Sequence, residues 1–353
     1  MQSEQIEIKR DETAWEIELK ASIPASAMEI YREESLKELQ KTAKLDGFRP
    51  GKVPLERLIA IYGEAQLLRL AAERAIQTEL PEILAKENLL IVEAPRVQTD
   101  TPEPGKPLAF TARASLPPEV KLPEWKKIAQ KHSAKKESVT VSDDEYTEAQ
   151  THIRRERARI EKVEKGEDQQ KAFEASKALP EADLPPLDEE FAKSLGYESE
   201  AKFLESLKTN ILSEKEAQKK QQLRNAILED IVKEASIHYP VVMREYELDD
   251  METRIKDDLA RMGASYEQYL IEVKKTREEL RKEWQEAADK RAKTRLILSE
   301  IARQEKIVAD AETIEAELKH AKEHYKEVDE NNLRSGIAHA MRNEKVLKLL
   351  EMQ

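Results

Sequence analysis

The stretch "AKLDGFRPGKVPLERL", residues 43–58, decides how the first part of the chain is organised. It combines two glycines, two prolines, a phenylalanine and several cations, whereas most of the chain is acidic and has a helical pattern. Gly47 follows a helical pattern at the place where a left-handed residue commonly ends a helix, and Pro54 stands where the next helix would begin. The stretch therefore predicts a helix–loop–helix with "DGFRPGKV" as its tip.

The predicted tip is positively charged, although the whole chain has a net charge of −12. Residues 41–52 have a local net charge of +3, and Phe48 stands where little chain is available to bury it. Aromatic residues and arginine are enriched at binding hot spots, and cations can meet phosphates or an acidic protein surface. Two interpretations follow: a docking device, or an interhelical turn whose Phe48 folds back onto its own domain.

The sequence around this tip predicts an α+β domain over residues 1–116. Alternating stretches predict a β-hairpin before it, and Pro24 opens a helix that leads into the tip. A second helix begins near Pro54 and continues past Gly63, and two further strands follow. The four predicted strands cover residues 5–8, 14–21, 89–95 and 108–114. We therefore predict a small antiparallel sheet with two helices and a protruding helix–loop–helix.

The remainder of the chain predicts long solvated helices. Residues 117–187 are predicted to be a linker with one linker helix, which Ser142 caps, and residues 167–187 have weak periodicity and three prolines. Residues 188–353 predict a mainly α-helical domain with arms, in an elongated molecule. Within its long helix, residues 213–222 lack Leu, Ile, Val and aromatic residues, so this part is expected to cross solvent.

Composition limits the classes of protein to which the chain can belong. Its 60 Lys and Arg against 72 Asp and Glu argue against a nucleic-acid coat, and the absence of cysteine excludes disulfides and thiolate metal sites. No stretch approaches 18 apolar residues and no secretory signal is visible, so a cytoplasmic protein without membrane contact is expected. We predict no catalytic residue, cofactor or metal. His320 and His324 share one side of a helix, but Ala321 stands where a metalloprotease motif has glutamate.

The segment "GFRPGKVP", residues 47–54, resembles the signature G-F-R-x-G-K-x-P of the bacterial trigger factor family of ribosome-associated chaperones. Other stretches are similar to the family at the expected places, and together they cover most of the chain. They are "IYGEAQL" (61–67), "VEAPRV" (92–97), "LPPEVKLPEWKKI" (116–128) and "DLPPLDEEFAKSLGYES" (183–199).

The resemblance implies a ribosome-binding N-terminal domain and a helical chaperone body with arms. Its implied partners are the large ribosomal subunit near the exit tunnel, with a ribosomal protein and adjacent ribosomal RNA, unfolded nascent polypeptides, and a second copy when the protein is free. Phe48 and Arg49 are the implied main ribosome contacts. The full implied contact set is Lys44, Gly47, Phe48, Arg49, Pro50, Gly51 and Lys52. Pro50 occupies the variable position of the signature and brings no charge.

The chain departs from the family between the linker helix and the helical body. Typical members carry a prolyl-isomerase domain there, of about a hundred residues, which is an ordinary domain size. Here only residues 167–182 lie between the flanking matches, with one aromatic residue, Phe173, and no glycine. So short a segment cannot build an aromatic-lined pocket. We therefore predict a chaperone without isomerase activity.

A chaperone of this kind would hold its clients through dispersed apolar side chains on a concave helical surface. Methionine suits such a surface because it adapts to varied partners. The candidate client contacts are Met243, Met251, Ile255, Leu259, Met262, Leu333, Ile337 and Met341. Alternatively, these residues pack arm against body. The alternative functions are a helical scaffold or adaptor that grips one protein partner with the basic tip, and a free holdase.

Overall fold

The structure of the chain is a computed structural model, and it describes residues 3–43, 45, 48, 51–134, 138–324 and 329–353. The chain divides into two compact units, each assembled from two separate stretches of sequence. The first unit contains residues 1–123 and 234–305, and the second contains residues 124–233 and 306–353. The helical region after residue 188 therefore contributes to both units.

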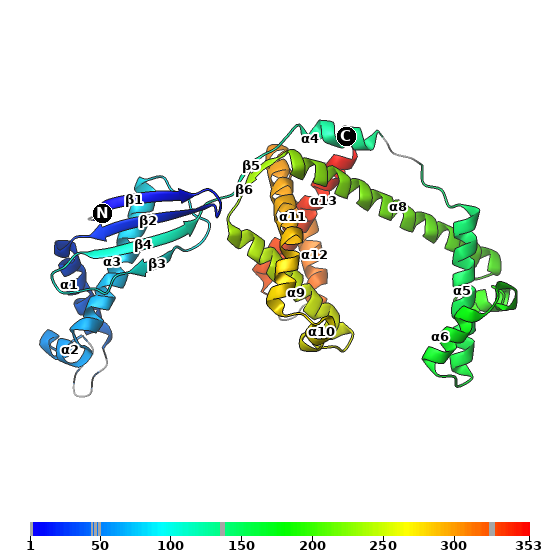
Figure 1. Ribbon diagram of the computed structural model, residues 1–353, viewed down its shortest axis with the longest axis horizontal. Helices are drawn as coiled ribbons and strands as arrows, with labels where there is room; N and C mark the ends of the chain where they lie inside the picture. The colour runs from blue at the N-terminus through cyan, green and yellow to red at the C-terminus, as the bar shows by residue number, and fades with distance from the viewer. Residues whose placement is uncertain (1–2, 44, 46–47, 49–50, 135–137, 325–328) are drawn as a thin grey trace. The chain divides into compact units, whose positions relative to one another are not determined.

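The first unit contains an antiparallel sheet of strands in the order β1-β2-β4-β3 (Figure 1). The strands are β1 (Glu4–Asp11), β2 (Glu16–Ile23), β3 (Arg96–Thr99) and β4 (Leu108–Ser115). The predicted hairpin β1–β2 is confirmed, and Asp11 Oδ1 organises its turn by accepting hydrogen bonds from the amides of Thr13 and Ala14 at 2.8 and 2.9 Å. In register, Ile17 pairs with Ala114 and therefore shares its face of the sheet.

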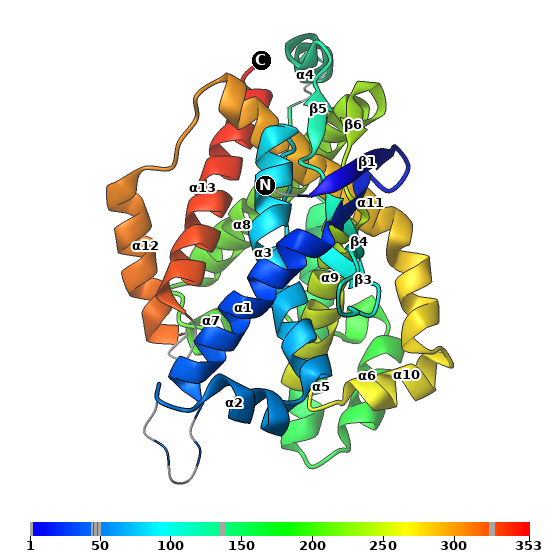
Figure 2. The ribbon, with the colours of Figure 1, turned by 90° about the vertical axis from the view of Figure 1, so that its left-hand side faces the viewer.

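Two helices cover the apolar face of this sheet: α1 (Ala25–Thr42) and α3 (Glu64–Lys86). Figure 2 shows α1 and α3 side by side. The alternation of β2 places Ile17 and Leu19 in the core, together with Trp15 just before the strand; all three are 1–4% exposed and pack with residues of both helices. The intervening Glu16 and Glu18 lie on the other face, where Arg96 and Arg113 pair with them. The alternation along β2 thus separates side chains that face the core from side chains that face solvent, as expected.

The prediction of a strand over residues 89–95 was wrong. Within this segment Leu89 and Ile91 pack against the core while Leu90 is 74% exposed. The backbone makes a hydrogen bond from Val92 N to Ser115 O, but the ladder with β4 begins only at Arg96. The apolar residues of this segment therefore lie against the edge of the sheet without forming a strand. The strand that pairs with β4 is β3, whose residues are all exposed.

The second predicted helix is two helices, α2 (Leu55–Tyr62) and α3, separated at Gly63. Gly63 adopts φ +79°, which an L side chain rarely adopts, and this ends α2 and lets α3 begin in a new direction. Arg32 of α1 holds the start of α3, because its Nε and Nη2 donate to the two carboxylate oxygens of Glu64 at 2.6 and 3.0 Å.

The first unit also contains a pair of long helices that come from the later part of the chain. They are α9 (Val241–Arg261) and α11 (Arg277–Gln304), with the short α10 (Tyr266–Val273) between them. Part of the stretch expected to be a linker forms β5 (Glu119–Lys121), which pairs antiparallel with β6 (Ser236–His238). This short ribbon leads from the sheet region into the helix pair.

The second unit is helical in its described part. Its helices are α4 (Trp125–Ser133), α5 (Asp143–Glu164), α6 (Gln169–Ala178), the 3-10 turn η1 (Glu181–Asp183), α7 (Glu189–Ser194), α8 (Glu200–Glu234), α12 (Ala311–His324) and α13 (Glu330–Glu351). An α+β N-terminal region followed by a mainly helical region confirms the predicted fold class. Helix α5 begins at Ser142 with the predicted capping box, in which Glu145 N donates to Ser142 Oγ.

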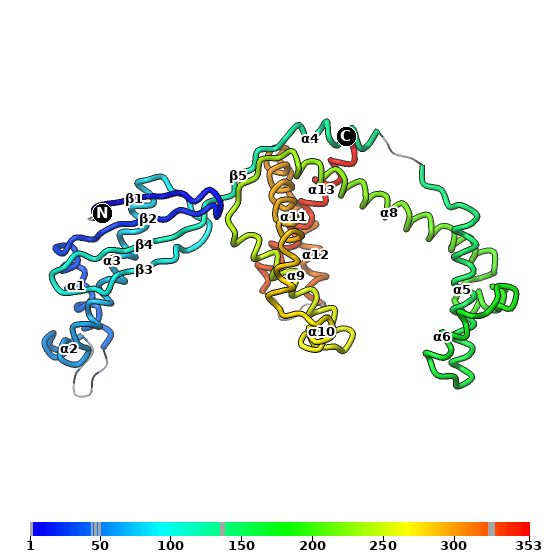
Figure 3. The backbone as a smooth tube through the Cα atoms, in the orientation of Figure 1, coloured from blue at the N-terminus to red at the C-terminus, as the bar shows by residue number. Residues whose placement is uncertain are grey.

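Helix α8 crosses solvent in its middle, as its composition predicts (Figures 1 and 3). Residues 216–222 are exposed, whereas Phe203 near its start and Ile227 near its end are buried. Just before this exposed segment, Lys215 Nζ donates to Thr140 O at 2.7 Å and pairs with Glu145, and within the segment Lys220 Nζ lies 3.5 Å from Glu351. The helix therefore joins two packed ends within the second unit.

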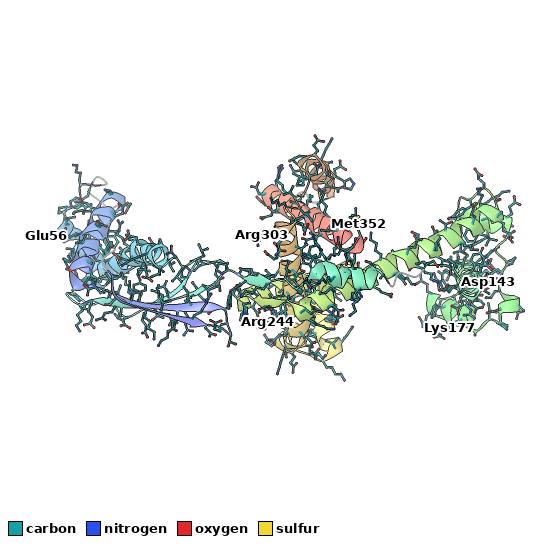
Figure 4. The ribbon with its side chains drawn as sticks, turned by 90° about the horizontal axis from the view of Figure 1, so that it is seen from above. Glu56, Asp143, Lys177, Arg244, Arg303 and Met352 are labelled. Atoms are coloured by element: carbon teal, nitrogen blue, oxygen red, sulfur yellow. The ribbon has the colours of Figure 1, made fainter. Side chains whose placement is uncertain are left out.

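Residues 167–182 are mostly helical, which corrects the expectation of a linker without helix. Asp168 caps α6 by accepting hydrogen bonds from the amides of Gln170 and Lys171 at 3.0 and 3.3 Å. Helix α6 returns along α5, and Asp143 and Lys177 mark these two helices in Figure 4. Its buried positions are Ala172 and Ser176. Because these side chains are small, the packed face of α6 does not show as an apolar pattern.

Candidate functional site

The tip between α1 and α2 stands on a well-packed base. Gly51 N donates to Gln40 O at 3.1 Å, and Gln40 Nε2 donates to Val53 O at 2.6 Å, so the two sides of the loop are tied together. Val53 and Leu58 are fully buried below it, in a small core that also contains Ala43. Gly51 adopts φ +80°, a conformation that favours glycine. The base is therefore fixed by both packing and backbone hydrogen bonds.

The structure leaves Phe48 40% exposed, with its amide donating to Leu45 O at 3.1 Å. Phe48 is therefore partly covered and partly open to solvent, and its assignment as a docking side chain stays a prediction. Lys52 is exposed as well. The other predicted contacts, Lys44, Gly47, Arg49 and Pro50, lie outside the described residues, so their assignment stays a prediction.

Acidic residues offset part of the charge next to the tip. Lys41 Nζ lies 3.6 Å from Glu38 at the end of α1, and both side chains are exposed. Exposed pairs of this kind contribute little to stability and are screened by salt. Arg57 on the first turn of α2 is also exposed and extends the cationic surface. The described surface beside the tip therefore combines an exposed apolar side chain, Phe48, with cations that face solvent.

The predicted client contacts on α9 differ in exposure. Met243, Met251 and Ile255 are half-buried, and Met262 is 74% exposed at the end of the helix. Leu259 is buried at 8% exposure, so it packs within its own unit and is corrected from a surface contact to a core residue. The apolar surface of α9 is thus built from its methionines and Ile255.

The predicted client contacts on α13 are all half-buried: Leu333, Ile337 and Met341. Further along the helix, Val346 and Leu350 are fully buried. Helix α13 belongs to the second unit and α9 to the first, so the candidate contacts on each helix are described within their own unit.

The sequence interpretation missed several exposed apolar residues. Tyr246 is 59% exposed on α9, Ile271 is 76% exposed on α10, and Leu90 is 74% exposed beside the sheet. Tyr246 stands three positions after Met243, so helical spacing alone could have placed it on the same side. Leu90 was missed because it lies within residues 89–95, which were predicted to form a strand. Phe173 is 51% exposed on α6.

Charged side chains join α9 to α11. Glu252 is 2% exposed, and its carboxylate accepts hydrogen bonds from Lys256, Arg277 and Arg281 at 2.7, 2.9 and 3.1 Å. Burial raises the pKa of Glu252, but the hydrogen bonds from these cations outweigh burial and lower it to about 2. Glu247, also 2% exposed, accepts a hydrogen bond from Arg291 Nε at 3.0 Å. These buried carboxylates are compensated within the helix pair, which gives them a structural role.

The part of the chain that the structure describes contains no cluster of three or more His, Asp or Glu side chains placed to hold a metal ion. No helix within the described ranges is long and apolar enough to cross a membrane.

The fold is that of a known chaperone. A solved structure, of a trigger factor chaperone studied for promiscuous substrate recognition in folding and assembly activities, matches with a TM-score of 0.52. It is 16% identical in sequence, and the match covers 98% of this chain and 99% of that chain. The arrangement of a small sheet domain and helical regions is therefore shared along the length of the chain.

The sequence comparisons identify the family. The model of the bacterial trigger factor protein matches residues 4–153, and the model of the trigger factor C-terminus matches residues 201–351. The chain belongs to the trigger factor family, which confirms the resemblance seen in its tip.

Relatives in this family are distant but match along most of their length. The trigger factor of Caldicellulosiruptor bescii is 26% identical over 386 positions, which cover 88% of this chain and 86% of the relative. The trigger factor of Clostridium botulinum strain Hall is 27% identical over 411 positions, which cover 91% of this chain and 93% of the relative. Both alignments are longer than this chain of 353 residues. The relatives therefore contain residues that this chain lacks.

Proposed function

We propose that the protein is an ATP-independent chaperone that docks on the large ribosomal subunit beside the exit tunnel and shields nascent polypeptides in the cytoplasm. The observation that carries this proposal is Phe48, exposed on a tip with a fixed base in a chain of the trigger factor family. The docking residues are Lys44, Gly47, Phe48, Arg49, Pro50, Gly51 and Lys52.

The construction of the tip suits docking. An apolar side chain held on a pre-formed base loses little conformational freedom on binding, and this favours affinity. The cations around it suit the phosphates of ribosomal RNA and acidic patches on a ribosomal protein. The chain as a whole is acidic at −12, so this attraction is confined to the tip.

We propose that the protein holds an unfolded polypeptide through many apolar contacts spread over a wide surface. The methionines of α9 and the half-buried residues of α13 offer dispersed apolar contacts among charged side chains. Weak contacts of this kind allow a polypeptide to leave and fold, and they require no nucleotide. The tip between α1 and α2 lacks the spacing of a phosphate-binding loop, because only three residues separate Gly47 from Gly51 and Val53, not Ser or Thr, follows Lys52.

We infer further that the protein lacks prolyl isomerase activity. The two matched ranges of the family leave residues 154–200 between them, and there the chain folds as the end of α5, α6, η1 and α7. Of these elements, α5 and α7 pack with the start of α8 around Leu187, Ala192 and Phe203. A short helical segment of this kind supports the absence of a separate isomerase domain.

Co-sedimentation with 70S ribosomes across a range of salt concentrations tests the docking proposal. The triple variant Phe48→Ala, Arg49→Ala, Lys52→Ala should lose at least about tenfold in affinity, because it removes the aromatic anchor and two phosphate-binding charges. The matched control is Leu90→Ala, Lys86→Ala, Lys106→Ala, which removes one exposed apolar residue and two exposed lysines elsewhere in the same sheet region.

The control should bind as the wild type does. The salt dependence of the triple variant should be shallower, since fewer counterions are released. Equal binding of the triple variant and the wild type would refute docking through this tip and favour a scaffold or free holdase.

A further inference from the structure

A small apolar pocket lies beside the start of α9. Its walls come from the segment Val92–Glu93 next to the sheet, from α9 with Met243 and Tyr246, and from α11 with Ala292. All three elements belong to the first unit. The pocket has a volume of about 190 Å³, and its wall is mainly apolar.

The volume is that of a single large side chain. An apolar protein cavity of about 150 Å³ is large enough to bind benzene, whereas a drug-sized ligand needs roughly 300 Å³ or more. At about 190 Å³ this pocket accommodates one aromatic ring or a branched aliphatic side chain. It is too small for a nucleotide or a folded segment.

The charged residues in the wall already have partners. Glu93 accepts a hydrogen bond from Ser115 Oγ at 2.7 Å. Glu247 Oε1 pairs with Arg295 Nη2 at 2.9 Å, and Glu247 Oε2 accepts from Arg291 Nε at 3.0 Å. A charged ligand would have to compete with these pairs. An uncharged apolar group would leave them intact.

We propose that this pocket binds one large apolar side chain, of the size of phenylalanine, from an unfolded polypeptide. The proposal rests on the chaperone function and assigns a contact within it, built jointly by the sheet region and the helix pair α9–α11. A site of this kind lets the region that carries the docking tip take part in holding the client.

The rim of the pocket favours an extended polypeptide as the occupant. Tyr246 is 59% exposed and Val92 is 43% exposed, so both offer apolar surface beyond the pocket itself. Met243, which is half-buried, is one of the α9 residues proposed above to contact clients. Its flexible side chain can adjust to rings and to aliphatic groups. A polypeptide with one inserted side chain would extend over this rim.

The test is a double-mutant cycle between the protein and its ligand. The ligand is a fluorescein-labelled 12-residue peptide without stable structure that contains one phenylalanine, and its partner peptide has alanine instead. Fluorescence anisotropy gives Kd for both peptides with the full chain, with Val92→Asp, and with the control Leu90→Asp. Leu90 is 74% exposed, lies two residues from Val92 and is not in the pocket wall.

With the wild type and with Leu90→Asp, the phenylalanine peptide should bind about tenfold tighter than the alanine peptide, because a buried ring contributes its full apolar area. With Val92→Asp this difference should fall to less than about twofold, because the added carboxylate charges the pocket mouth. An unchanged tenfold difference with Val92→Asp would overturn the pocket assignment while leaving the chaperone proposal in place. Failure of every peptide to bind the wild type would overturn both.

A second measurement needs no variant. In protein carrying 13C-methyl methionine, the resonance of Met243 should shift on addition of the phenylalanine peptide and much less on addition of the alanine peptide, because ring currents act over short distances. The exposed Met352 serves as the internal reference. Equal responses of Met243 to both peptides would place the ring elsewhere.

Discussion

Glu252 shows how a single residue connects the two long helices of the first unit. Its side chain is 2% exposed, yet it carries a charge at neutral pH, because three cations surround it. Breaking a buried pair by removing one partner is costly, since the remaining charges lose their compensation. The cations Lys256 and Arg277 are themselves about half exposed, which moderates this cost.

We expect Glu252→Gln to destabilise the α9–α11 pair by about 2–3 kcal/mol at pH 7. The native pKa of about 2 is below the ordinary value of 4.5, so the charged form contributes stability that is present above pH 4.5 and lost as pH falls toward 2. The difference between wild type and variant should therefore shrink through this window. Hydrogen exchange of α9 and α11 at pH 7, 4.5 and 3, read by mass spectrometry after correction for intrinsic exchange rates, measures it locally.

The control is Glu272→Gln, an exposed position on α10. This change should alter the opening free energy by less than about 0.5 kcal/mol at each pH. If Glu252→Gln proved equally mild at pH 7, the carboxylate would not be a structural charge and its low pKa would be contradicted.

At the same scale, the sequence predicted some residues of the sites and could not predict others. The exposure of Phe48 could be predicted, because a phenylalanine among glycine, proline and cations at a helix junction has little chain to cover it. Leu259 was misassigned because helical spacing places it with Met251 and Ile255, while its burial depends on which elements pack on that side. The ion pairs of Glu252 with Arg277 and Arg281 connect positions 25 and 29 residues apart, and no local pattern reveals them.

At the scale of elements, the segment that follows α5 is held by arginines of that helix. Arg154 donates from Nε to Pro185 O at 3.0 Å, and from Nη2 to Glu181 O and Leu184 O at 2.9 and 2.6 Å. Three carbonyls of one irregular stretch therefore converge on a single guanidinium. Arg157 adds hydrogen bonds to Pro186 O and to Asp188 Oδ1. Residues 181–188 are therefore held in place as an ordered part of the second unit.

We expect Arg154→Lys to destabilise residues 167–187 by about 1–2 kcal/mol, because an ammonium group cannot serve three carbonyls in a fork geometry. Lysine keeps the positive charge of Arg154, so a loss of stability would come from the lost hydrogen-bond geometry of the guanidinium group. Hydrogen exchange should rise in α6 and η1 and remain unchanged in α9 and α11, which belong to the other unit.

Arg159→Lys is the matched control on the same helix. Arg159 pairs with Glu156 three residues earlier, and a pair on the helix surface contributes little. The control should leave exchange in α6 within about 0.5 kcal/mol of the wild type. Equal exchange in the two variants would mean that packing of Ala172 and Ser176, and not the guanidinium, holds the segment.

Helices and strands could be predicted where their apolar residues kept one period over many positions. The hairpin β1–β2 and helix α1 were predicted within a few residues, because their apolar positions repeat at two or near 3.6. Helix α6 was missed, because small residues form its packed face. The ribbon β5–β6 was missed, because it joins two three-residue strands more than a hundred residues apart, and strands of that length have no pattern of their own.

At the scale of the whole molecule, the proposed function is to hold unfolded polypeptides without catalysing prolyl isomerisation. Holding needs apolar surface, which the described part of the chain offers on α9 and α13 and around Val92 and Tyr246. Isomerisation needs a pocket that encloses a proline and its neighbours, and the family relatives carry additional residues that are absent here. Both activities can be measured on one client, which makes the separation testable.

We expect the full chain to suppress aggregation of an unfolded client at equimolar concentration, with and without ATP, and to leave the proline-limited refolding rate of that client unchanged at one hundredth of its concentration. Uncatalysed prolyl isomerisation takes roughly tens of seconds at 25 °C, so a catalyst would shorten this phase at a small molar fraction. Light scattering follows aggregation, and tryptophan fluorescence follows the slow refolding phase. A purified prolyl isomerase is the positive control for the second measurement.

A slower refolding phase at equimolar protein would be consistent with holding, since a bound client cannot fold, and the substoichiometric condition removes this effect. An accelerated phase at one hundredth of the client concentration would contradict the absence of isomerase activity and would require a catalytic pocket outside the elements that follow α5. Unsuppressed aggregation would instead contradict holding, whatever the refolding rate. Because holding depends on apolar surface and the chain is proposed to have no isomerase activity, Val92→Asp should weaken aggregation suppression and leave the refolding rate unchanged.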